Sequence, residues 1–141
     1  MRSFVSNNDE QTLDLGRELG RSLQGGEVIL LRGGLGAGKT LLTKGILDGL
    51  GFDIDEVTSP SFSLVNLYKT DRFDVYHLDL WRLEGPNPEL AVGLPEILSD
   101  QNAVVIIEWS ERLTKPPTNR RIVTIDIAGD GDDPRTFEIG V

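Results

Sequence analysis

Residues 33–40 read Gly-Gly-Leu-Gly-Ala-Gly-Lys-Thr and set the architecture of this 141-residue chain. They satisfy the pattern G-x-x-x-x-G-K-[ST], the phosphate-binding loop that joins a strand to a helix. Its glycines let consecutive backbone N–H groups curl around phosphate oxygens, and the following helix presents its positive N-terminal end to the same anion. The stretch therefore predicts a P-loop that binds a nucleotide.

The residues on both sides of the loop agree with this interpretation. Residues 27–32 (EVILLR) form a short apolar run typical of a strand buried on both faces, and residues 41–50 are expected to form a helix. Lys39 is expected to reach the β- and γ-phosphates, and the Thr40 hydroxyl to bind Mg²⁺, which prefers oxygen ligands. The predicted nucleotide-binding residues of the loop are Leu35, Gly36, Ala37, Gly38, Lys39 and Thr40.

Hydrophobic patterning predicts the other elements of an α/β fold. Strands are expected at residues 4–6, 62–68, 73–80, 103–109, 121–127 and 137–141. A polar turn separates the second of these from the third, which indicates an antiparallel hairpin. A helix is expected after Asn8 or Asp9, either of which can cap it, and short helices are expected within residues 85–98. We predict one P-loop domain over residues 1–141, with a mixed, mainly parallel sheet flanked by helices.

Two carboxylates are candidates for the acidic group that a P-loop needs. Glu108 follows four apolar residues and Asp79 ends another β-rich run, so each is expected at the carboxyl end of a strand, where α/β sheets bind their ligands. Either side chain suits a metal ligand or a residue that positions the attacking water. The sequence leaves open which of the two binds the metal directly.

Other residues near these motifs have less specific interpretations. Segment 58–63 (TSPSFS) is either a switch loop that senses the γ-phosphate or an ordinary proline-containing turn. His77, Trp81 and Trp109 are interpreted as packing residues, and no catalytic role is predicted for them.

Composition excludes several classes of function. The chain has no cysteine, so disulfides and thiolate metal sites are impossible. Its formal net charge is −9, which argues against a broad surface for nucleic acid. No apolar run is long enough to span a membrane and no export signal opens the chain, so a cytoplasmic protein is expected.

Four motifs in order resemble one family. After the P-loop come Ser-Pro-Ser-Phe-Ser-Leu-Val at residues 59–65, Tyr-His-Leu-Asp-Leu-Trp-Arg-Leu at 76–83 and Ile-Glu-Trp at 107–109. Together they resemble the TsaE (formerly YjeE) family, small bacterial ATPases of tRNA threonylcarbamoyladenosine synthesis, over residues 9–135. The chain departs from the usual family residues at Gly34, Ser61, Trp81 and Ser110.

This resemblance implies an ATP- and Mg²⁺-dependent ATPase that docks on a complex of TsaD and TsaB and meets tRNA only through that complex. It assigns Lys39 and Thr40 to phosphate and Mg²⁺, Glu108 to the metal or the attacking water, and Asp79 to the surroundings of the metal. Thr12 and Arg135 match places near the base and ribose in similar proteins.

Alternative functions come from other classes. A GTPase would need a base-reading N-K-x-D segment, which the chain lacks, so ATP is favoured over GTP. A small-molecule kinase would need a substrate region and an arginine-bearing lid, for which little chain remains beyond residues 85–98. A nucleotide-gated binding module with negligible hydrolysis differs from an ATPase only in turnover, so the sequence does not separate the two.

Overall fold

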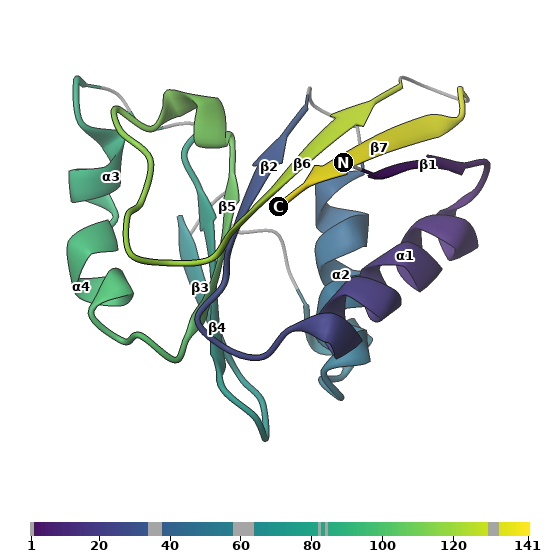
Figure 1. The fold of residues 1–141 in the computed structure, drawn as a ribbon, viewed down its shortest axis with the longest axis horizontal. Coiled ribbons are helices and arrows are strands. Elements are labelled where there is room, and N and C mark those ends of the chain that lie inside the picture. The colour runs from purple at the N-terminus through teal and green to yellow at the C-terminus, as the bar shows by residue number, and fades with distance from the viewer. Residues whose placement is uncertain (1, 34–37, 58–63, 82, 84, 130–132) are drawn as a thin grey trace.

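The structure is a computed structural model that describes residues 2–33, 38–57, 64–81, 83, 85–129 and 133–141. Within these residues, one seven-stranded sheet has helices on both faces (Figure 1). The strands are β1 (Arg2–Ser6), β2 (Val28–Arg32), β3 (Val65–Lys69), β4 (Asp74–Asp79), β5 (Val104–Glu108), β6 (Ile122–Ala128) and β7 (Arg135–Gly140). The helices are α1 (Asp9–Ser22), α2 (Lys39–Gly49), α3 (Pro88–Ala91) and α4 (Leu94–Leu98), with 3₁₀ turns η1 (Ile54–Glu56) and η2 (Ser110–Arg112).

The strand order is β1-β7-β6-β2-β5-β4-β3, which places β2 at the centre of the sheet. Parallel pairs join β6 to β2, β2 to β5 and β5 to β4, whereas β3, β7 and β1 are joined to their neighbours by antiparallel pairs. The predicted fold class, including the hairpin of β3 and β4, is therefore confirmed. Because β2, β4, β5 and β6 run in the same direction, their carboxyl ends meet at one edge of the sheet.

Each face of the sheet has its own apolar core. On one face, Leu15 and Leu19 of α1 and Leu42 and Ile46 of α2 pack with a set of strand residues that includes Ile106. On the other face, α3 and α4 cover the region of β2, β5 and β4 (Figure 1). Every residue of β5 is buried because both faces above it are covered.

Close backbone contact holds α1 against α2. A Cβ atom on Gly16 would lie 2.6 Å from the carbonyl oxygen of Leu42, and one on Gly45 would lie 2.5 Å from that of Leu13. Only glycine permits this approach without displacing a helix. The contact sets the position of α2, and hence of the P-loop residues at its start.

Two local details differ from or sharpen the sequence expectations. The first helix is capped by Asn8, whose side chain accepts a hydrogen bond from the Gln11 backbone N–H at 2.9 Å. The second helix begins at Lys39 rather than at residue 41, because Gly38 takes a left-handed conformation (φ 98°) and turns the chain directly into it. No helix among the described residues is long and apolar enough to cross a membrane.

Candidate functional site: the carboxyl edge of the central strands

The P-loop lysine lies at the first turn of α2. Lys39 is buried, and its Nζ donates a hydrogen bond to the carbonyl oxygen of Gly33 at 2.8 Å, which spans the loop from end to end. Thr40 follows it on the same turn of the helix. The predicted nucleotide-binding residues Leu35, Gly36 and Ala37 lie outside the described residues, as does the predicted switch segment 58–63.

Burial and three nearby carboxylates have opposite effects on the pKa of Lys39. Desolvation lowers the pKa of Lys39 below its ordinary value, while the negative charges of Glu108, Glu111 and Asp79 act in the opposite direction. Its Nζ also lies 3.9 Å from the ring centroid of Trp109, within the range of a cation–π interaction. The lysine is thus a partly desolvated positive charge beside acidic side chains.

Glu108 and Asp79 end neighbouring parallel strands. They are register partners, and Glu108 also pairs with Leu31 of β2, two residues before the P-loop begins. Both side chains are buried. Asp79 lies on the same face of β4 as Val75, and Glu108 lies on the same face of β5 as Ile106. Val75 and Ile106 belong to the core that α2 covers. The structure therefore brings the two predicted carboxylates together on the side of the sheet that carries Lys39 and Thr40.

Different groups hold the two carboxylates. Asp79 Oδ1 accepts a hydrogen bond from the backbone N–H of Trp81 at 2.9 Å. Glu108 Oε2 lies 2.5 Å from Nε2 of His77, which is completely buried on β4. Sequence reasoning assigned no role to His77. The signal was present, because His77 stands two residues before Asp79 and therefore shares its face of the strand.

The segments that follow the two carboxylates are joined to each other. The indole rings of Trp81 and Trp109 stack with centroids 4.2 Å apart and planes inclined by 27°. Arg112 donates hydrogen bonds to the carbonyl oxygens of Leu80 and Trp81 at 2.6 and 2.7 Å, and Ser110 Oγ donates to that of Leu31 at 3.3 Å. The carboxyl ends of β2, β4 and β5 are consequently one connected unit.

Thr12 and Arg135 lie near a different corner of the sheet. Thr12 Oγ1 lies 2.7 Å from Ser6 Oγ, and Ser6 is the register partner of Arg135 in the β1–β7 pair. Arg135 donates to the carbonyl oxygen of Asp133 at 2.6 Å. The strand order places this corner on the opposite side of β2 from Asp79. The structure brings these two residues near each other, but not next to the carboxylates.

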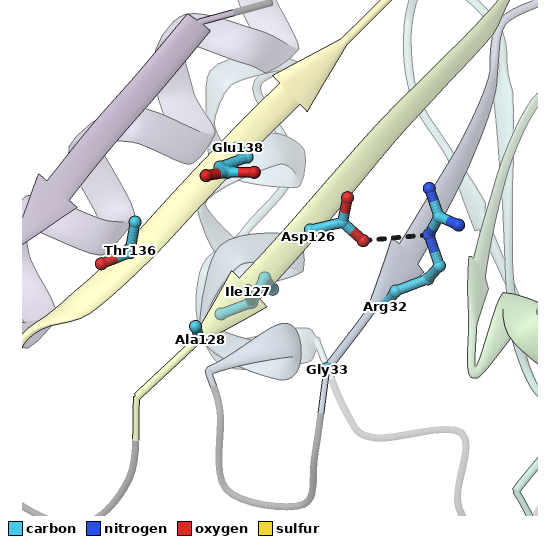
Figure 2. Close-up of a pocket in the computed structure, with 7 residues that line it drawn as sticks. All are labelled: Arg32, Gly33, Asp126, Ile127, Ala128, Thr136 and Glu138. Atoms are coloured by element: carbon cyan, nitrogen blue, oxygen red, sulfur yellow. Dashed lines mark ion pairs between the residues drawn. The ribbon is translucent and has the colours of Figure 1, made fainter.

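A pocket that sequence reasoning missed lies between β2 and this corner. Its volume is about 270 Å³, and Figure 2 shows its lining: Arg32, Gly33, Asp126, Ile127, Ala128, Thr136 and Glu138. Arg32 Nε and Asp126 Oδ1 form an ion pair at 3.0 Å, drawn as a dashed line. The pocket reaches the P-loop at Gly33. The only sequence feature that could have indicated this pocket is the alternation of polar residues along β6 and β7.

The oxygen donors at this edge suit Mg²⁺. Among the described residues, no group of three or more His, Cys, Asp or Glu side chains could hold a metal by itself. Mg²⁺ does not require such a group, since proteins often hold it through one or two carboxylates while phosphates and waters complete its octahedron. Thr40, Asp79 and Glu108 offer a hydroxyl and two carboxylates, which fit that chemistry.

Comparison with known proteins gives a consistent result. The family described as threonylcarbamoyl adenosine biosynthesis protein TsaE matches residues 6–137. A tRNA threonylcarbamoyladenosine biosynthesis protein TsaE from Nostoc sp. is 44% identical over 126 residues, which cover 86% of this chain and 76% of the relative. The same-named protein from Treponema pallidum is 35% identical over 129 residues, covering 91% and 93% of the two chains.

A solved structure has the same fold. The crystal structure of YdiB from Bacillus subtilis matches with a TM-score of 0.68 and 31% sequence identity. The match covers 96% of this chain and 82% of that one.

Proposed function

The chain belongs to the TsaE family of tRNA threonylcarbamoyladenosine biosynthesis, and we propose that it is a Mg²⁺-dependent ATPase that supports this modification together with TsaD and TsaB. We propose that residues 1–141 act as one P-loop ATPase domain in the cytoplasm, and that tRNA is reached only through the partner complex. The observation that carries the proposal is the grouping of buried Lys39, Glu108 and Asp79 at one edge of the sheet.

Each of these residues has a role in the proposed reaction. Lys39 would stabilise negative charge on the β- and γ-phosphates, because its ammonium is already partly desolvated at the start of α2. Glu108 would orient the attacking water or bind the metal, and Asp79 would assist at the metal. Mg²⁺, held by Thr40 and a carboxylate, would neutralise charge on the phosphate oxygens. Thr12 and Arg135 are proposed to lie near the base and ribose.

ATP turnover in the presence and absence of the partners tests this function. We expect slow, Mg²⁺-dependent hydrolysis by the protein alone and faster hydrolysis with TsaD and TsaB. ATP binding without hydrolysis in both conditions would instead indicate a nucleotide-gated binding module. Transfer of the γ-phosphoryl group to a small molecule rather than to water would indicate a kinase.

The first prediction concerns Lys39. Lys39→Ala is expected to abolish ATP binding or hydrolysis, because a preorganised positive charge on the phosphates disappears. Lys44→Ala, five residues further along α2, is the matched control and should keep turnover within about twofold. Isothermal titration with ATP and a phosphate-release assay measure the two effects. Turnover at the original rate in Lys39→Ala would refute the P-loop assignment.

A further inference from the structure

We propose that His77 is a positioning residue for Glu108. It donates a hydrogen bond from Nε2 to Glu108 Oε2 and thereby leaves Oε1 to act on the metal or the attacking water. This inference rests on the proposed function, because only that function gives Glu108 a metal or an attacking water to act on. It concerns the orientation of the carboxylate rather than a proton transfer.

The contact is short and lies in the interior of the protein. Nε2 and Oε2 are 2.5 Å apart, His77 is fully buried and the Glu108 side chain is 5% exposed. The two residues come from adjacent parallel strands, where His77 is the register partner of Ile106. Glu108 follows two residues later on the same face of β5, so the pair is set diagonally across the sheet.

The donor and the acceptor follow from the chemistry of the groups. An ionised Glu108 only accepts hydrogen bonds, so Nε2 of His77 must carry the proton. In a neutral imidazole, Nδ1 is then an acceptor. Within the described part of the chain, Nδ1 is buried and has no hydrogen-bond partner.

An unpaired ring nitrogen argues against a role in packing alone. Burying a polar atom without a partner is unfavourable, and the neighbouring core positions of β4, Val75 and Leu78, are aliphatic. An aliphatic residue at position 77 would fill the core without that cost. The bond to Glu108 is what the imidazole adds.

Orientation matters because a glutamate side chain has three rotatable bonds. A carboxylate held through one oxygen presents the other in a single direction, which removes reorganisation before reaction. Loss of such a supporting hydrogen bond behind a metal-binding or catalytic group commonly costs 10- to 100-fold in affinity or rate. The Asp79 carboxylate accepts a hydrogen bond of its own from the Trp81 backbone N–H.

NMR spectroscopy tests the hydrogen bond without any need for turnover. His77 is the single histidine of the chain, so its imidazole signals need no assignment. In ¹⁵N-histidine-labelled protein we expect the Nε2-protonated tautomer with a slowly exchanging Hε2 proton. The signals should move in Glu108→Gln but not in the control Glu111→Gln, which removes a nearby charge on η2. An Nδ1-protonated ring, or signals unaffected by Glu108→Gln, would overturn the inference.

Kinetics test what the bond does. His77→Leu should lower kcat for ATP 10- to 100-fold while ATP affinity stays within about twofold. His77→Gln should recover most of the rate, because its amide N–H can donate near the position of Nε2. Val75→Ala, a buried change on the same strand and face, should lower stability but leave kcat of the folded protein unchanged.

The outcomes separate this inference from the proposed function. Original kcat in His77→Leu, or a loss in His77→Gln as large as in His77→Leu, would refute the positioning role. Absence of turnover in the unmodified protein with its partners would refute the ATPase function, and the NMR experiment would still decide whether His77 holds Glu108. If His77→Leu does not fold, His77→Gln and the NMR spectra carry the test.

Discussion

Glu108 and Asp79 end neighbouring parallel strands, but their surroundings suit them to different tasks. Glu108 has one oxygen held by His77 and lies next to the strand that leads into the P-loop. Asp79 is one strand further away and is held by a backbone N–H that follows it in the chain. This difference favours Glu108 as the residue closest to the chemistry.

Substitution of Glu108 tests that assignment. Glu108→Gln should still bind ATP but hydrolyse it about 100-fold more slowly, since the amide keeps the shape of the side chain and loses the charge that metal or water requires. Steady-state hydrolysis and ATP affinity should be measured together, with Glu111→Gln as the control for a charge change nearby. Unchanged turnover in Glu108→Gln with a loss in Asp79→Asn would move the role to Asp79.

Helix α3 is fastened to the segment that follows β5 by one buried carboxylate. Glu89 Oε2 accepts a hydrogen bond from the backbone N–H of Thr114 at 2.9 Å. Burial alone would raise the pKa of Glu89, but hydrogen bonds from Thr114 and Lys115 outweigh it and hold the pKa below its ordinary value. Arg112 joins the segment after β5 to the segment after β4, through the carbonyl oxygens of Leu80 and Trp81.

The lowered pKa of Glu89 predicts a dependence of stability on pH. Because the folded-state pKa lies below the unfolded-state value of about 4.3, the ionised form stabilises the fold above that pH. The contribution is lost as the pH falls through the folded-state pKa. The Glu89→Gln variant should therefore have a lower free energy of unfolding than the parent near pH 7. The difference between the two should become smaller at acidic pH. Thermal unfolding of both proteins between acidic and neutral pH measures this difference in stability. A difference that does not change with pH would contradict the prediction.

Helices α1 and α2 depend on paired glycines for their contact. Gly45→Ala should lower the free energy of unfolding by about 1–3 kcal/mol, because the new Cβ would lie 2.5 Å from the Leu13 carbonyl oxygen and force the helices apart. Lys44→Ala, at the position before Gly45 in α2, should change the free energy of unfolding by less than about 0.5 kcal/mol. Denaturant unfolding of both variants provides the comparison. Equal stabilities would show that the helices separate without cost.

The whole chain carries a formal net charge of −9, which bears on its relation to tRNA. A polyanion is repelled at long range, so any contact with tRNA must be local and organised by partners. We predict weak or undetectable tRNA binding by the protein alone at physiological salt. Titration of labelled tRNA measures it, and submicromolar affinity without partners would contradict the electrostatic argument.

ATP-dependent association with TsaD and TsaB is the other half of this prediction. Partner binding can depend on the bound nucleotide only if the partner contacts elements that the γ-phosphate orders. The surface that binds the partner should therefore include the opening of the P-loop and the segment after Glu108. Binding to the partner complex should be compared with ATP, ADP and no nucleotide. Association that is independent of nucleotide would exclude a switch.

Local sequence was sufficient for much of this architecture. The glycine-lysine-threonine pattern located the P-loop, the apolar runs located β2 and β5, and the polar residues that end such runs located Asp79 and Glu108. Each of these conclusions depends on neighbours within a few positions, because glycine conformation, strand burial and strand ends are properties of short segments. The P-loop roles themselves remain predictions.

The remaining features required the order and register of the strands. The contact of His77 with Glu108 joins residues 31 positions apart, and the pocket beside Gly33 combines β2, β6 and β7. The close packing of Gly16 and Gly45 joins two helices that β2 separates in the chain. Periodicity says which face of an element is buried but not which element covers it, so only the three-dimensional arrangement identifies these partners.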